Sequence, residues 1–470
     1  MSVDPKTAYL RGRITVKGTL RLDAPLLIGE GASGEARSDR DIHVLRNKDG
    51  VPFIPGTSLA GALRSFADAE DPFGAQLLFG TLTESGAEKK GGDDQWQSAV
   101  SLYDVLLKDA VLGSRDGVSI DEVTRTAVLH GKYDYEIVES GACGAFYAEI
   151  LLRGIHEGHR PRLKAMLERL RDLLCSGFHV GALTTKGFGR LHLEAMEIDG
   201  YDFQRPADVI AWLSPKRGKA SYHRTERDFA KSLTKRVYGA EDFMIEADFA
   251  LAGALIVRDY EEANQMREEG KAPDALMKKN PAGAYIIPGT SLKGVLRHRA
   301  AFILRTLGKE AAMADALMGP APQRMQKMKQ EERFRSRFVV EEAEVKGEAY
   351  PQTRIRCDRF TGGTISSALF STEPVWAANM AAHAVTLRFG AKRAQAWEAG
   401  LCLLLLKDLW LGRIAIGGEK SVGRGSLMGL CAEIYYQGKK WTLKGDQPTP
   451  EATARALQEW VTALCEEAGA

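Results

Sequence analysis

The chain has 470 residues, of which 44% are hydrophobic and 27% charged, so it is long enough for two or three domains with real cores, and its composition excludes a disordered protein. Its 64 Lys and Arg nearly balance its 62 Asp and Glu, so any nucleic-acid surface has to come from local clustering of charge. The six cysteines form no C-x-x-C pair, which argues against a zinc ribbon or a disulfide framework and fits a reducing cytosol. We find no apolar run of about 18 residues and no signal-peptide pattern at the start, so we expect a cytoplasmic protein without a membrane partner.

The sequence contains an internal repeat. Residues 41–64 and 274–297 align without a gap, and twelve of these 24 positions are identical, including the run I-P-G-T-S-L. A second match lies downstream, where T-T-K-G-F-G-R at 184–190 aligns with G-E-K-S-V-G-R at 418–424. Because both landmarks recur in the same order, the repeat predicts tandem domains.

We expect the first domain at residues 1–205, a linker at 206–240 and the second domain at 241–470. Within the linker, residues 214–236 carry eight Lys and Arg against two acids. This stretch is either a solvated basic connector or a strap on RNA phosphates.

Each half has the same coarse order of expected elements. An opening strand (13–22 or 243–257) precedes an irregular loop, the I-P-G-T-S turn, a helix and a middle region of strands and loops. A long amphipathic helix (160–178 or 394–412), a Gly-rich turn and a final strand close each half. This mixture predicts an α+β fold with helices on one face of an antiparallel sheet.

The repeated turn and helix suggest a phosphate site. Thr57 and Ser58, like Thr290 and Ser291, follow a Pro-Gly turn and are expected to be helix N-caps. A helix start offers unpaired N–H groups and a positive dipole end, which suits a phosphate.

Two further positions recur in this helix. Gly61 and Gly294 are expected in its first turns, where glycine is unfavourable, so either a close ligand or helix–helix packing would explain them. Arg64 and Arg297 follow, where they could meet a phosphate or a structural carboxylate.

The second landmark is a short basic Gly-rich turn in each half. Glycines let N–H groups point at a phosphate and the basic residues add charge, although a plain turn between strands would have the same pattern. The expected pairs are Lys186 with Lys420, Gly189 with Gly423 and Arg190 with Arg424.

One acidic residue recurs ahead of the repeated proline. Asp41 aligns with Asp274, whereas Asp39 and His43 have no counterpart in the second half. A lone carboxylate in a polar loop can hold a hydrated Mg²⁺ or position a reacting hydroxyl. An Asx turn or a loop cap is the alternative.

The motif of Asp, I-P-G-T-S-L-x-G-x-L-R and a distant basic Gly-rich turn resembles the RAMP superfamily of CRISPR-associated proteins. It is most similar to the repeated backbone subunit of type III effector complexes, and two fused units resemble the arrangement of subtype III-D. The resemblance implies two RRM-like (ferredoxin-like) domains, each with an inserted β-hairpin thumb. The stretches 118–129 and 355–366 are the candidates for these thumbs.

The resemblance also implies a function. Such subunits polymerise along the CRISPR RNA, bind neighbouring effector subunits and cleave the paired target RNA, with Mg²⁺ or another divalent cation, through the loop Asp. By motif position the catalytic and metal-binding residues would be Asp41 and Asp274. The Gly-rich stretch 26–39 before Asp41 is not matched by 255–273, so cleavage at Asp274 is the weaker expectation.

Two other functions stay open at this point. The chain could be a non-catalytic RNA-binding scaffold, or a guide-processing ribonuclease that uses a histidine, for which only His43 is near the candidate site. The residues expected to bind RNA are Thr57, Ser58, Gly61, Arg64, Lys186, Gly189, Arg190, Thr290, Ser291, Lys293, Gly294, Arg297, Lys420, Gly423 and Arg424.

Overall fold

The chain folds into two compact units. The first comprises residues 1–113, 136–182 and 189–237, and the second comprises residues 114–135, 183–188 and 238–470. The computed structural model describes residues 9–30, 42–81, 96–121, 124, 126–214, 219–226, 238–259, 262–263, 266, 273–320, 328–329, 333–379 and 382–467.

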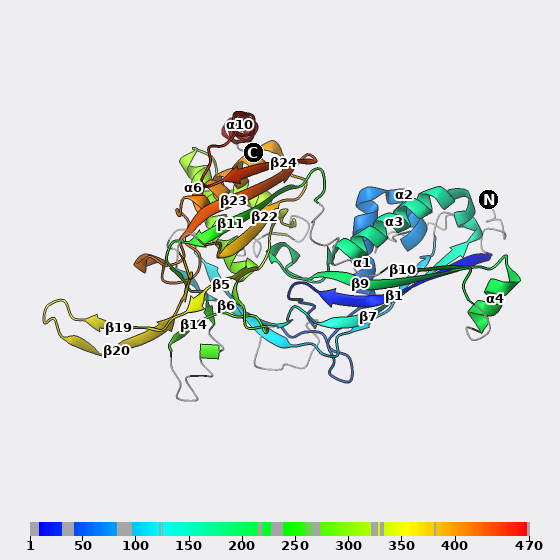
Figure 1. The fold of residues 1–470 in the computed structure, drawn as a ribbon, viewed down its shortest axis with the longest axis horizontal. Helices are drawn as coiled ribbons and strands as arrows, with labels where there is room; N and C mark the ends of the chain where they lie inside the picture. Colours follow the sequence, from blue (N-terminus) through cyan, green and yellow to red (C-terminus); the bar gives the residue numbers. More distant parts are fainter. Residues whose placement is uncertain are drawn as a thin grey trace. The chain divides into compact units, whose positions relative to one another are not determined.

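The first unit is built on an antiparallel sheet with strand order β10-β9-β1-β7-β3, in which β8 also pairs with β9 (Figure 1). The central strand β1 pairs antiparallel with both β7 and β9. The elements of this unit are β1 (Leu10–Leu22), β2 (Phe53–Ile54), α1 (Gly56–Glu70), α2 (Pro72–Phe79), β3 (Val100–Leu102), β4 (Val105–Leu106), β7 (Cys143–Arg153), α3 (Arg160–Ser176), β8 (Phe178–His179), β9 (Arg190–Asp202), α4 (Pro206–Leu213) and β10 (Tyr222–Glu226).

Helices α1 and α3 cover one face of this sheet because each has an apolar stripe at helical spacing. Leu59, Leu63 and Ala67 of α1 are buried. They share one core with buried residues of α3 and of the strands, including Leu163 and Phe146.

The second unit repeats this plan around a sheet with strand order β15-β17-β22-β11-β23-β24, in which β16 also pairs with β22. Its central strand β11 pairs antiparallel with β22 and β23. The elements are β11 (Phe243–Leu251), β12 (Ala254–Leu255), β13 (Arg258–Asp259), β14 (Ala275–Met277), β15 (Tyr285–Ile287), α6 (Gly289–Thr306), α7 (Met313–Met318), β16 (Phe338–Val340), β17 (Ala343–Val345), β18 (Glu348–Ala349), β19 (Gln352–Cys357), β20 (Thr364–Glu373), β21 (Val375–Trp376), β22 (Val385–Ala391), α9 (Ala396–Trp410), η6 (Lys420–Val422), β23 (Leu427–Tyr436), β24 (Lys439–Lys444) and α10 (Glu451–Glu466).

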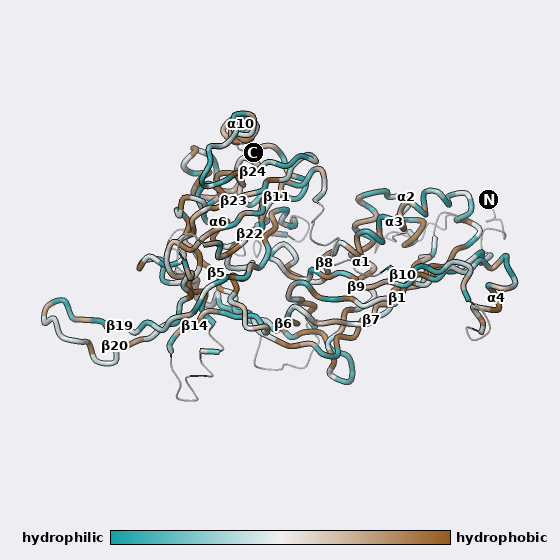
Figure 2. The backbone as a smooth tube through the Cα atoms, viewed as in Figure 1, coloured by the Kyte–Doolittle hydropathy of each residue, from teal (hydrophilic) through white to brown (hydrophobic). Residues whose placement is uncertain are grey.

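The core of the second unit lies between its sheet and helices α6 and α9. Leu292 and Leu296 of α6 pack in one cluster with Phe249 and Phe389 of the strands. Helix α9 is apolar on nearly all sides because α10 covers its outer face through Trp460 and other residues. In Figure 2 the central strands β11, β22 and β23 show hydrophobic segments alternating with more hydrophilic ones, as expected for strands with one face against the core.

These two sheets confirm the expected α+β class, with helices gathered on one face of an antiparallel sheet. Within the described ranges, no helix combines the length and apolar character needed to cross a membrane.

The boundaries of the units differ from those expected from the sequence. Residues 114–135 and 183–188 belong to the first repeat by sequence but to the second unit by packing. They contain most of the β5 (Leu112–Ile120) and β6 (Ala127–Val138) hairpin and the short helix η3 (Thr184–Lys186). The stretch 206–240, expected as a linker, contains α4 and the edge strand β10 of the first sheet.

The repeated helices begin earlier than expected. Their N-caps are Pro55 and Pro288, with ψ of 138° and 139°, and no side chain caps either end. The expected N-cap role of Thr57, Ser58, Thr290 and Ser291 is therefore wrong. Proline fits the cap because its fixed φ leads into the helix.

Candidate functional site

The first turns of α1 and α6 each have an exposed face that includes a glycine. Thr57 and Gly61 of α1 lie one turn apart and are exposed, and Gly294 of α6 is exposed as well. A Cβ added to Gly61 or Gly294 would meet nothing within 4 Å in the described structure. Helix–helix packing among the described residues therefore does not account for these glycines, and there is room for a ligand to approach the backbone closely.

The extreme N-termini of both helices already contact protein groups. The Gly56 amide donates to Asp104 Oδ1 at 2.8 Å. A Cβ on Gly289 would lie 2.1 Å from the Lys186 carbonyl oxygen, so that carbonyl fills the space at the start of α6. A phosphate at the first amide of α1 would have to displace a carboxylate, so the exposed helix face at Thr57 and Gly61 suits RNA better than the tip.

Arg64 and Arg297 make the same contact in the two repeats. Arg64 donates to the carbonyls of Phe79 and Gly80 at 3.1 and 3.0 Å, where α2 ends. Arg297 donates to the Gly319 carbonyl at 2.7 Å, where α7 ends. Both guanidinium groups thus satisfy helix C-terminal carbonyls, which gives the repeated arginine a structural role in place of the expected RNA contact.

Lys293 is buried within the second unit. Its ammonium donates to Thr185 Oγ1 at 2.9 Å, to Ser336 Oγ at 2.7 Å and to the Phe338 carbonyl at 2.8 Å. Burial, with the nearby cation Lys186 next in effect, lowers the pKa of Lys293 to about 7. With 6% of its surface exposed, Lys293 is a packing residue and is poorly placed to meet RNA.

The basic turns of the two repeats align differently from the sequence match. In both turns a left-handed residue, Leu183 or Glu419, precedes a one-turn 3₁₀-helix that ends at a glycine of positive φ, Gly187 or Gly423. The next glycine, Gly189 or Gly425, also has positive φ.

Each of these last two glycines meets a carbonyl oxygen at 1.9 Å from an added Cβ, that of Val180 or Ile416. The structural offset is therefore 236, and the expected pairing at 234 is wrong. Lys186 is equivalent to Val422 and Arg424 to Phe188. Each turn contains two glycines separated by one residue, so the sequence alignment could pair the second glycine of one turn with the first glycine of the other. Only the backbone conformation distinguishes them.

The predicted residues of the first basic turn serve the fold. Gly189 is required by its strand contact, and Arg190 pairs with Asp23 at 3.1 Å and donates to the Ser176 carbonyl at 2.8 Å, where α3 ends. Burial, and then Arg297, lower the pKa of Lys186, which is half-buried. In the second turn, Lys420 and Gly423 are exposed, so this turn is the better candidate for a phosphate contact.

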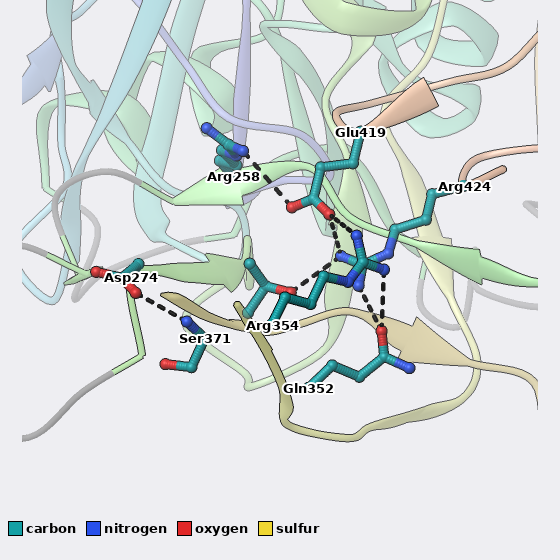
Figure 3. Close-up of polar contacts among 8 residues, drawn as sticks. Arg258, Asp274, Gln352, Arg354, Ser371, Glu419 and Arg424 are labelled. Atoms are coloured by element: carbon teal, nitrogen blue, oxygen red, sulfur yellow. Dashed lines mark hydrogen bonds and ion pairs between the residues drawn. The ribbon is translucent and has the colours of Figure 1, made fainter. Parts of the chain in front are cut away.

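Asp274 lies at the base of the β19–β20 hairpin (Figure 3). Its amide donates to the Ser371 carbonyl at 2.9 Å, and the Ser371 amide donates to Asp274 Oδ2 at 2.8 Å. The carboxylate is exposed. Because β14 pairs parallel with β20, this reciprocal contact fixes the carboxylate at the hairpin base. Asp41, its counterpart in the repeat, lies outside the described residues.

The metal prediction can be tested against the donors around Asp274. Among the described residues, no group of three or more His, Cys, Asp or Glu side chains is placed to hold a metal ion. Mg²⁺ often binds through one or two carboxylates together with substrate phosphates. Asp274 fits a site of that kind, in which RNA supplies the other ligands.

A charged cluster next to Asp274 was not expected from the sequence. Glu419 Oε2 lies 2.8 Å from Arg424 Nη1 and 3.3 Å from Arg354 Nη1, and its Oε1 lies 3.5 Å from Arg258 Nη2 (Figure 3). Arg424 is buried and also donates to Gln352 Oε1 at 2.6 Å. Arg424 was expected to bind phosphate directly, whereas its burial places it behind the other arginines.

The two stretches expected to contain thumbs each span the turn of a β-hairpin, β5–β6 and β19–β20. Figure 2 shows hydrophobic segments among hydrophilic ones along β19–β20. Phe360, in the turn, is 98% exposed, and Leu369 on β20 is 65% exposed. Exposed apolar side chains on a two-stranded hairpin indicate an interaction surface for a ligand or a partner.

Residues 19–192 and 231–427 match the family model of the RAMP superfamily, and each segment contains one copy of the repeat. The chain belongs to the RAMP superfamily. RAMP proteins bind CRISPR RNA and assemble in CRISPR complexes, so membership supports an RNA-binding role in such a complex. The two matched segments agree with two RAMP domains in one chain. No curated protein matches the sequence significantly.

Proposed function

We propose that this RAMP protein is a CRISPR RNA-binding backbone subunit of a type III effector complex and that it cleaves the complementary target RNA. The observation that carries the proposal is the recurrence of one loop carboxylate, as Asp41 and Asp274, within a doubled RAMP sequence. The fusion of two units supports an arrangement like that of subtype III-D.

The order of the elements supports the RRM-like domain. The first unit runs β1-α1-β3-β7-α3-β9 and the second runs β11-α6-β17-β22-α9-β23, with further elements inserted. This is the β-α-β-β-α-β order of ferredoxin-like folds. Hairpin β5–β6 lies between β3 and β7, and hairpin β19–β20 lies between β17 and β22. Both are therefore inserted between the third and fourth elements of this order, and they would be the thumbs.

The proposed chemistry is a transesterification within the target strand. The ribose 2′-hydroxyl gives its proton to a water molecule and attacks the adjacent phosphorus, a 2′,3′-cyclic phosphate forms, and the 5′-oxygen leaves with a proton from water. Asp274, anchored to β20 by Ser371, would orient this hydroxyl, and the hairpin would hold the sugar in line. A bound divalent cation would supply neutralisation of the charge that develops on the phosphate.

The test is target cleavage by the complex purified from its native operon, after its RNA content has been identified. Asp41→Ala and Asp274→Ala should each remove one subset of cut sites and leave assembly intact. Chelation of divalent cations should remove all cuts. Unchanged cleavage ladders in both variants would contradict the assignment.

A second candidate is a scaffold that binds RNA without cutting it. It needs only the RNA-binding role that membership of the RAMP superfamily supports, and it makes no use of the Asp274 carboxylate. Cleavage that is absent from the purified complex, or insensitive to chelation, would select this function.

A further inference from the structure

We propose that Arg258 and Arg354 form a clamp for one RNA phosphate beside Asp274, at the base of the β19–β20 hairpin. The inference rests on the RNA-binding part of the proposed function and specifies which chemical group of the RNA this site takes. It does not require that the chain cleaves RNA.

The cluster carries more positive charge than its own carboxylate can neutralise. Three guanidinium groups, those of Arg258, Arg354 and Arg424, surround the single carboxylate of Glu419. Arginine stays protonated in proteins, so these four side chains have a net charge of +2. Burial is the main cause that lowers the pKa of Arg424, and repulsion from Arg354 and Arg258 adds to it. An anion bound here would relieve that repulsion.

The outer arginines are accessible and the inner residues hold them. The side chains of Arg258 and Arg354 are 41% and 32% exposed, whereas that of Arg424 is 3% exposed. Gln352 Oε1 accepts from both Arg354 and Arg424, at 3.3 and 2.6 Å. Two guanidinium groups held from behind in this way can offer paired N–H groups to phosphate oxygens.

Among the described residues of the first repeat, the positions equivalent to three members of this cluster carry no charge, so the shared fold does not depend on charge there. Arg258 pairs with Met277 as Gly29 pairs with Val44, so Gly29 is its counterpart. At the structural offset of the basic turns, Leu183 is the counterpart of Glu419.

The same offset makes Phe188 the counterpart of Arg424. The same backbone is thus compatible with apolar residues at all three positions. Arg258, Glu419 and Arg424 thus have no charged counterpart in the first repeat, and a ligand taken by the second repeat would explain them.

The cluster adjoins Asp274 through the hairpin strands. Ser371, which exchanges hydrogen bonds with Asp274, is paired with Thr353, the residue between Gln352 and Arg354. The next residue, Thr372, accepts a hydrogen bond from Arg424 at 3.1 Å. A phosphate on the two outer arginines would therefore lie near the Asp274 carboxylate, with their charge offsetting the repulsion between the two anions.

The experiment measures binding of a labelled single-stranded RNA to the RNA-free full chain over a range of KCl concentrations. The variants are Arg258→Gln, Arg354→Gln and the double substitution. Arg388→Gln is the matched control, because Arg388 is also ion-paired in the second unit, to Glu246 at 3.3 Å, with a side chain 30% exposed.

We expect the double variant to bind more weakly and its log–log salt slope to fall by about 0.7, the value for one phosphate contact on a single strand. Arg388→Gln should bind as the unmodified chain does. Arg258→Lys and Arg354→Lys, which keep the charge and lose the fork, should retain the salt slope and lose part of the affinity. Thermal unfolding verifies that the variants fold, and if Arg354→Gln does not, the lysine variants decide.

An unchanged affinity and salt slope in the double variant would overturn the clamp. A loss of affinity equal to that of Arg388→Gln would overturn it too, since it would reflect general charge alone. If the double variant loses the slope while no condition yields cleavage, the clamp stands and the nuclease proposal fails. If the unmodified chain does not bind RNA, both the clamp and the proposed RNA-binding function are contradicted.

Discussion

The Lys293 ammonium donates a hydrogen bond of 2.9 Å to Thr185 Oγ1 and so joins α6 to the segment 183–188, which comes from the other repeat in sequence. The first repeat has Ala60 at the position of Lys293. The lysine is therefore found only in the repeat whose helix packs against residues 183–188, a segment of the first repeat that belongs to the second unit.

The lowered pKa of Lys293 predicts a pH-dependent stability of the second unit. In the unfolded chain Lys293 binds its proton below about pH 10.5, but in the folded chain only below about pH 7. Between these values the unfolded state binds more protons, so the free energy of unfolding should rise with pH, by at most about 1.4 kcal/mol per unit for this group.

Urea denaturation at pH 7 to 10 measures this dependence. Lys293→Met should flatten it, because methionine keeps the length without the charge. Lys164→Met is the control, since Lys164 is 78% exposed. A slope that is equally steep in Lys293→Met would show that other groups cause it.

Arg297 provides a test of structure against RNA binding. Arg297→Met removes the donors to the Met318 and Gly319 carbonyls and to Asp315, so the free energy of unfolding should fall by roughly 1.5–3 kcal/mol. The salt slope of RNA binding should not change. Arg413→Met, whose side chain is 57% exposed, should cost less than about 0.5 kcal/mol. Undiminished stability with a reduced salt slope would restore the RNA-binding role.

The sequence predicted the features that local chemistry dictates. The I-P-G-T-S-L run marks both repeats because Gly56 and Gly289 each meet a backbone carbonyl too closely for any side chain. It could not tell whether Arg64 and Arg297 meet phosphates or carbonyls, since a guanidinium group suits both. The cluster around Glu419 was missed because its members lie as far apart in sequence as Arg258 and Arg424.

Two glycines of α6 should respond in opposite ways to the same substitution. Gly289→Ala places a methyl 2.1 Å from the Lys186 carbonyl oxygen, so it should destabilise the second unit by about 1–3 kcal/mol. Gly294→Ala meets nothing within 4 Å in the described structure and should stabilise α6 by up to about 1 kcal/mol.

RNA affinity tests whether an RNA strand contacts α6 at Gly294. If an RNA strand approaches the bare helix face, Gly294→Ala should weaken RNA binding although the protein is more stable. Thermal unfolding and RNA titration of the same preparations measure both effects. Affinity at or above that of the unmodified chain would mean that no strand contacts this face.

We expect the exposed ring of Phe360, in the turn of the β19–β20 hairpin, to stack on an RNA base. Asp358 Oδ1 accepts hydrogen bonds from the amides of Phe360 and Thr361 at 3.0 and 2.8 Å, and these fix the turn that presents the ring. These bonds, with that of the Thr361 hydroxyl, lower the pKa of Asp358, so the turn should keep its form at neutral pH. An aromatic ring held in this way can stack on a base with little further loss of conformational entropy.

Phe360→Ala should change the free energy of unfolding by less than about 0.5 kcal/mol, because the ring packs on so little. RNA affinity should fall by about 1–3 kcal/mol, the usual contribution of one stacked base, and Phe360→Trp should retain it. Met428→Ala, another exposed apolar side chain of this unit, is the control. A fluorescent base analogue in the RNA reports stacking directly, and an identical signal with Phe360→Ala and the unmodified chain would exclude Phe360 as the stacking residue.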